Sequence, residues 1–140
     1  MTRARLIILC LGLGCATSSS SEHLAYVPSP EAVIKPQELI ERIITATPGA
    51  TVTFEDAFFV VHEHGTAEPT RQMVRYDGLD KVELFSQTND GVKVFGVVLT
   101  DKKQRSMFQW ATKSRGDAQK LADAISVLAS SRVQDHDKKP

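Results

Sequence analysis

The chain has 140 residues, which suits one small domain, and its 17 Lys and Arg residues balance its 17 Asp and Glu residues. Hydrophobic residues make up 41% and charged residues 24%, a globular composition that excludes a wholly disordered chain. The zero formal charge argues against a nucleic-acid partner, which requires a basic excess or stripe. No apolar run approaches the roughly 20 residues of a spanning helix, so a polytopic membrane protein is excluded.

The start of the chain has the pattern of an export signal. Arg3 and Arg5 supply positive charge, residues 6–13 form a short apolar run, and small residues follow at 14–16. This order is typical of a secretory signal, and the apolar run is too short to span a bilayer stably. We therefore expect residues 1–14 to be a signal peptide that is not part of the fold.

The segment Leu11-Gly12-Leu13-Gly14-Cys15-Ala16 resembles the lipobox of bacterial lipoproteins. In that family the cysteine is diacylated and the chain is cut just before it, so the resemblance implies lipidation of Cys15. Two or more acyl chains, at about 0.8 kcal/mol per buried CH₂, hold a protein on a bilayer where one chain does not. Because Ala16 rather than Asp follows, the resemblance also implies the periplasmic side of the outer membrane if the source has two membranes. Cleavage near Ala16 and secretion of a soluble protein is the alternative.

A polar spacer follows this cysteine. Four serines at 18–21 predict a flexible tether, which continues to the stiffer Pro28-Ser29-Pro30. We expect residues 15–30 to be the lipidated cysteine and tether. Residues 31–131 are then a single domain, and residues 132–140 a disordered polar tail.

The expected domain begins with a helix. Pro36 suits its first position, Glu38 is an acidic residue in its first turn, and Thr47-Pro48-Gly49 stops it. Alternating or continuously apolar stretches then predict strands, at residues 51–54, 57–64, 71–76, 81–85, 92–100 and 105–112. The stretch 92–100 is apolar on both faces, so we expect it to be a central strand.

The last expected element is a helix with a complete apolar face. Ser114 and Asp117 form a capping-box-like start, and Asp123 lies off the apolar face. Apolar side chains recur every three or four residues, at Ala118, Leu121, Ala122, Ile125, Leu128 and Ala129. The order predicts an α+β fold: an N-terminal helix, a curved antiparallel sheet or partly open barrel of about five to six strands, and a C-terminal amphipathic helix packed on it.

Three stretches of this domain resemble the pleckstrin-homology-like (PH-like) and GRAM-like domains of bacteria. Residues 75–84 look like their strand–turn–strand, and residues 108–110 with 117–125 look like their last strand and closing helix. The resemblance implies a non-catalytic binding module. It does not extend to phosphoinositide recognition, because the loop at residues 62–68 carries no Lys or Arg.

The motif His62-Glu63-His64 is a candidate metal site. On a strand the two imidazoles point to the same face, as two zinc ligands require. A third ligand would have to come from Glu68 or His23 through the fold. The alternative is a pair of exposed histidines where a strand enters a loop.

Lys102, Lys103 and Arg105 form a basic tip on an expected hairpin. One interpretation is a solvated turn that protects a sheet edge. The other is contact with anionic headgroups or wall polymer, because each such charge contributes about 1 kcal/mol near an anionic surface. We expect the nearby Phe108 and Trp110 to pack in the core.

The sequence has no Gly-x-Ser-x-Gly elbow, no Gly-rich phosphate loop, and no cysteine after Cys15. We therefore expect a protein without catalytic activity or cofactor. The leading hypothesis is a lipid-anchored envelope protein whose domain binds another envelope protein or component. One alternative is a carrier of a lipid or small apolar molecule in a pocket between sheet and helix. Another is a metal-binding protein that uses His62 and His64.

Overall fold

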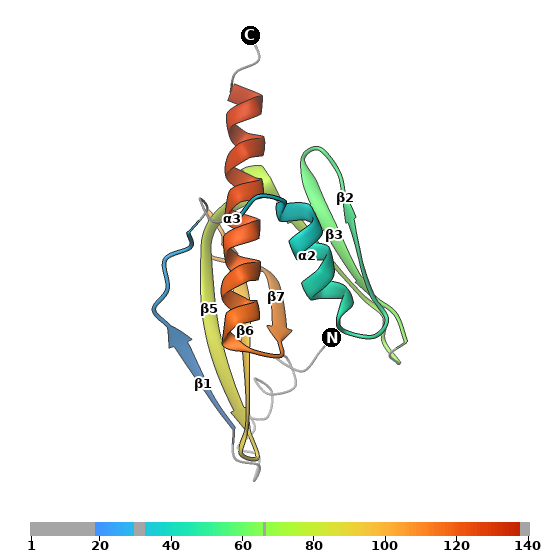
Figure 1. The fold of residues 1–140 in the computed structure, drawn as a ribbon, viewed down its shortest axis with the longest axis vertical. Coiled ribbons are helices and arrows are strands. Elements are labelled where there is room, and N and C mark those ends of the chain that lie inside the picture. The colour runs from blue at the N-terminus through green and yellow to red at the C-terminus, as the bar shows by residue number, and fades with distance from the viewer. Residues whose placement is uncertain (1–18, 30–32, 66, 138–140) are drawn as a thin grey trace.

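The computed structural model describes residues 19–29, 33–65 and 67–137. Within these residues it has seven strands in two antiparallel sheets and two α-helices, so the expected α+β class is confirmed. The two sheets do not join into a closed barrel. Figure 1 shows the long helix α3 lying along the strands, with the shorter helix α2 beside it.

The first sheet is an antiparallel meander of three strands. It consists of β2 (Ala50–Phe54), β3 (Phe58–Glu63) and β4 (Thr70–Arg75), with β3 in the middle. Each lies within a residue or so of a strand expected from the alternation of its side chains. Phe59 and Val61 of β3 are buried in the core that the sheets share with the helices.

The second sheet has four strands in the order β1-β5-β6-β7. Its last three strands are β5 (Leu79–Asn89), β6 (Val92–Asp101) and β7 (Ser106–Thr112). The strand β6 lies between β5 and β7, which confirms the central strand expected at residues 92–100. The strand β5 is longer at both ends than the expected 81–85.

The strand β1 (Ser19–Leu24) differs from the flexible tether expected over residues 15–30. It pairs with β5 in register from Ser19 opposite Asn89 to Leu24 opposite Leu84, and it raises the strand count above the expected five or six. It also precedes α2, so α2 is not the first element. The hydrogen bonds between strands are made by backbone N–H and C=O groups, which every residue here carries. A serine-rich segment can therefore form a strand where it lies beside the unpaired edge of a sheet.

The two sheets meet at β4 and β7 through a side chain. The Nε2 of Gln72 donates to the carbonyl of Gln109 at 3.1 Å, and the Oε1 of Gln72 accepts from the Gln109 N–H at 3.0 Å. A primary amide carries the same donor and acceptor as a peptide group. Gln72 therefore replaces one step of strand pairing where the sheets separate.

The helix α2 (Pro36–Thr45) begins with Pro36 at its first turn and buries Ile40, Ile43 and Ile44. The helix α3 (Arg115–Asp137) begins as expected, because the Oγ of Ser114 accepts from the Asp117 N–H at 3.1 Å.

The backbone of α3 continues as a helix through residues 132–137, which differs from the disordered tail expected over residues 132–140. These six residues include no Gly or Pro, and each one that joins a helix adds a backbone hydrogen bond at little further cost. The last three residues, 138–140, lie outside the described part.

The apolar face of α3 is buried as its periodicity predicts. It packs on the sheets and α2 through Ala118, Leu121, Ala122, Ala124, Ile125, Leu128 and Ala129. Phe108 and Trp110 are also buried, with their rings stacked at a centroid distance of 6.2 Å, which confirms their expected place in the core. One apolar cluster therefore joins both sheets and both helices.

Candidate functional site

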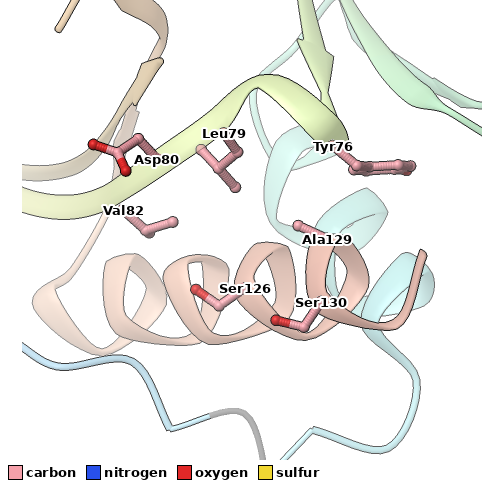
Figure 2. A pocket seen from close by; sticks show the side chains of 7 residues that line it. All are labelled: Tyr76, Leu79, Asp80, Val82, Ser126, Ala129 and Ser130. Atoms are coloured by element: carbon pink, nitrogen blue, oxygen red, sulfur yellow. The ribbon is translucent and has the colours of Figure 1, made fainter. Parts of the chain in front are cut away.

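A groove of about 380 Å³ lies between the start of β5 and the second half of α3. Seven residues line it: Tyr76, Leu79, Asp80, Val82, Ser126, Ala129 and Ser130. Figure 2 shows the β5 side chains above the helix and the α3 side chains below them, with Tyr76 at one end. We call this feature the β5–α3 groove.

Small side chains on one face of α3 create the groove. Ser126, Ala129 and Ser130 are spaced i, i+3 and i+4, so they share a face of the helix. None of them is large enough to fill the space opposite Leu79 and Val82 of β5, which are half-buried. The groove thus continues the buried face of α3 at the point where its side chains become short and polar.

The aromatic ring of Tyr76 forms a fixed wall at one end. Tyr76 begins the 3-10 turn η2 (Tyr76–Gly78) that joins β4 to β5, and its backbone N–H donates to the Ala57 carbonyl at 3.1 Å. Its side chain is buried, and its ring centroid lies 6.2 Å from that of Phe59. Because the core holds this ring on its other side, the wall is rigid.

The lining is an apolar floor with a polar rim. Asp80 is the one charged residue among the seven, and its Oδ2 accepts from the Nε2 of Gln104 at 3.5 Å. The lining includes two serines but no His or Lys that could activate a hydroxyl as a nucleophile. Its chemistry suits an apolar group that carries a neutral or cationic polar end, and it does not suit a phosphate or carboxylate.

Asp123 on α3 binds the N-terminal segment of the fold. Its Oδ1 accepts from the hydroxyl of Tyr26 at 2.7 Å and from the N–H of Ser29 at 2.8 Å, and Asp123 is only 9% exposed. Burial, and then the hydrogen bond to Asp123 and its negative charge, raise the pKa of Tyr26 to about 12. This contact, which we call the Asp123 clamp, was missed in the sequence because its partners are more than 90 residues apart.

His62 and His64 lie on the same face, as the strand pattern predicts. Their rings are nearly parallel, with centroids 5.7 Å apart. The fold brings neither expected third ligand to them: His23 lies in β1 with its Nδ1 3.8 Å from Glu83, and Glu68 is exposed in the loop after β3. Among the side chains that the structure describes, in residues 20–29, 33–65 and 67–131, no three of His, Cys, Asp or Glu are grouped to hold a metal ion.

The basic residues Lys102, Lys103 and Arg105 are exposed in the turn between β6 and β7. The Nε of Arg105 lies 3.0 Å from the Oδ2 of Asp101, which pairs the charge of this arginine. Backbone N–H groups of Arg105 and Lys103 also donate to Asp101, and the first of these does most to lower the pKa of its carboxyl group. The turn therefore presents the ammonium groups of the two lysines next to an arginine whose charge is paired with that of Asp101.

Cys15, the expected lipidation site, lies outside the described residues. Neither helix in the described part of the chain is long and apolar enough to cross a membrane. Comparison with known proteins gives no match: no family model, no curated protein and no solved structure matches this chain.

Proposed function

We propose that this protein is an exported lipoprotein, held on the cell envelope by acyl chains on Cys15, whose body is a non-catalytic binding domain. The observation that carries the proposal is the segment Leu11–Ala16, with a small residue before the cysteine, directly after a short basic and apolar signal. The described fold begins only four residues after Cys15, so anchor and body follow each other along the chain. With Ala16 after the cysteine, the site of residence is the periplasmic side of the outer membrane in a two-membrane cell.

The proposed fold type is PH-like. Two antiparallel sheets followed by a C-terminal helix that packs on them support this assignment, and the amide of Gln72 links the sheets at β4 and β7. The strand β1 and the helix α2 are additions to that plan. A PH-like body is consistent with binding rather than catalysis, since its core is filled by packing residues.

The β5–α3 groove is the proposed binding surface, and a segment of another envelope protein is the proposed occupant. Its volume of about 380 Å³ accommodates one or two side chains, and its open side admits a continuous polypeptide. Asp80 and the serines on the rim can accept hydrogen bonds from that segment, while Leu79 and Val82 receive an apolar side chain.

A small apolar molecule is the second candidate occupant. The observation in its favour is the apolar floor formed by Tyr76, Leu79, Val82 and Ala129. The buried face of α3 is occupied by the core, so a carried molecule would lie in the groove and not inside the fold. Native mass spectrometry of protein purified from its own envelope would detect it.

The anchor is tested by Cys15→Ser, with Cys10→Ser as the matched control. In cells fed a palmitate analogue, Cys15→Ser should lose all label and leave the membrane fraction. Cys10→Ser should keep both, because Cys10 lies in the discarded signal. Undiminished labelling of Cys15→Ser would show that the lipobox assignment is wrong.

The groove is tested by photocrosslinking in the native envelope. A photoreactive amino acid at the exposed Ser130 should capture one defined protein, whereas the same group at the exposed Lys113 should not. Filling the groove with Ser126→Phe should abolish the capture. A crosslink that persists in Ser126→Phe would place the partner elsewhere. A bound small molecule displaced by the same substitution would favour the second candidate.

A further inference from the structure

The N-terminal segment at residues 19–29 is part of the folded domain and not a flexible tether. Six residues of β1 pair with β5, and Leu24 at its end packs against the core. The Asp123 clamp then holds Tyr26 and Ser29 on α3. Ser19 is the first residue of this segment that the structure describes, and it is already paired in the sheet.

The distance from the anchor to this point is short. Cys15 precedes Ser19 by four residues, and a fully extended chain spans at most about 3.5 Å per residue, or about 14 Å in all. A free 15-residue tether would instead have a root-mean-square length of about 20 Å and would allow every orientation of the domain. The end of the sheet that holds Ser19 therefore lies within about 14 Å of an anchored Cys15, which favours an orientation with this end towards the bilayer.

The feature at that end is the tip of the β5–β6 hairpin. Ser19 lies opposite Asn89, which antiparallel pairing places about 5 Å away, and the turn residues Asp90 and Gly91 follow at once. Both turn residues have positive φ, of 49° and 82°, which is typical of a tight two-residue turn. Figure 1 shows the start of β1 beside this turn at the lower end of the molecule.

An apolar side chain projects from this tip. Val92 is 64% exposed, and it is one of three large hydrophobic residues exposed in the described part of the chain. The neighbouring charges of Asp90 and Lys93 are opposite in sign, so the tip carries no net charge. The tip therefore suits the boundary between headgroups and acyl chains through Val92, with little dependence on ionic strength.

The opposite end of the hairpin holds the other candidate surfaces. Leu79 pairs with Asp101 there, ten residues along β5 from Asn89, which corresponds to roughly 33 Å of extended strand. The lysines of the β6–β7 turn follow Asp101, and the β5 residues of the β5–α3 groove begin at Leu79.

From these distances we infer that the lipid bilayer carrying the anchor is also a docking partner of the domain, contacted by the β5–β6 tip through Val92. The basic turn and the groove then face away from that bilayer. This inference rests on the proposed lipid anchor. It replaces the expectation that Lys102, Lys103 and Arg105 touch headgroups of the membrane to which the protein is attached.

The test uses the mature lipidated protein in vesicles of phosphatidylethanolamine and phosphatidylglycerol. With Cys15 acylated, a single introduced cysteine is the one free thiol of the mature chain. Val92→Cys and the control Lys103→Cys are each labelled with an environment-sensitive fluorophore. Because both positions are exposed, neither change disturbs the core. Nitroxide-labelled lipid should quench the label at position 92 several-fold more than the label at 103, in low and high salt alike.

A second variant tests the short connection itself. A flexible insert of twelve Gly and Ser residues between positions 18 and 19 should reduce the quenching at position 92 towards that at 103. Equal quenching at the two positions, or stronger quenching at 103, in protein that floats with the vesicles would overturn the orientation and leave the anchor standing. Protein that does not float with the vesicles would overturn the anchor and, with it, the orientation.

Discussion

The Asp123 clamp gives the most direct test of how the N-terminal segment is held. One buried oxygen accepts two hydrogen bonds, from Tyr26 at 2.7 Å and from Ser29 at 2.8 Å. Asp123→Ala removes both bonds, so the Tyr26 hydroxyl and the Ser29 N–H must donate to water instead. Tyr26→Phe removes only the first bond and keeps the aromatic ring.

The expected loss follows from the energy of hydrogen bonds to charged groups, about 1.5–3 kcal/mol each when buried. Both donors here are on partly exposed residues that water can reach, so we take the lower end and expect Asp123→Ala to cost about 2–3 kcal/mol in total. For a domain of this size that is roughly a 10 °C fall in Tm. Tyr26→Phe should cost about 1 kcal/mol, and the double variant should show a coupling energy of similar size.

Guanidinium denaturation measures these losses, with the exposed Lys120→Ala on the same helix as the control, expected within about 0.5 kcal/mol of the parent. Hydrogen exchange should localise the effect, with faster exchange in residues 19–29 of Asp123→Ala. Unchanged stability and exchange in Asp123→Ala would refute the idea that this carboxylate holds the segment.

The tyrosine titration gives an independent readout of the clamp. The folded pKa of Tyr26 is raised from 10.0 to about 12, so the protonated hydroxyl is favoured in the native state. The protonated Tyr26 hydroxyl therefore contributes fully to the free energy of unfolding below pH 10, and this contribution is lost as the pH rises towards 12. In Asp123→Ala the ultraviolet titration of Tyr26 should move back towards 10, and the difference in stability from the parent should shrink across the same range. A titration midpoint that does not move would contradict the assigned hydrogen bond.

Three further substitutions test the core and the junction of the sheets. Leu121→Asp places an unpaired carboxylate at a position that is 0% exposed, so circular dichroism should show an unfolded chain, whereas Lys120→Asp at the exposed neighbouring position should melt normally. Gln72→Ala removes both bonds between the sheets and should lower the free energy of unfolding by about 1–3 kcal/mol; a neutral result would mean that the junction does not need the amide. Gly96→Ala would bring a methyl group against the backbone carbonyl oxygen of Trp110 and within 2.5 Å of the Cζ of Phe85, so we expect a loss of about 1–3 kcal/mol, and full stability would show that the β7 backbone and this ring both move aside.

Much of the fold follows from local patterns. The expected helix at Pro36 and all six expected strands between residues 51 and 112 are present, because side-chain alternation and 3.6-residue periodicity are properties of short segments. All six residues expected on the apolar face of α3 are buried, although Ala124 joins them in the core without having been expected there, and His62 and His64 share a face as expected.

The elements missed in the sequence share a different origin. The polar composition of Ser19–Leu24 suggests a linker, but this segment forms a strand because its backbone pairs with the edge of β5. The sequence places Asp123 off the apolar face of α3, where it would be solvated, and only the returning segment 25–29 buries it. The groove likewise depends on how far α3 lies from β5 at Ser126 and Ser130, which no local pattern encodes.

The sequence by itself determined the class of fold, the identity of the core helix face and the presence of a signal-like segment ending in Cys15. Each of these features follows from the order of charged, small and apolar residues within a short segment of the chain. Only the tertiary structure decided that residues 19–29 belong to the body, that Asp123 is buried, and which end of the sheet holds Ser19. The physical reason is that these features join groups as much as 97 residues apart, through backbone pairing and a shared carboxylate oxygen that carry no local signature.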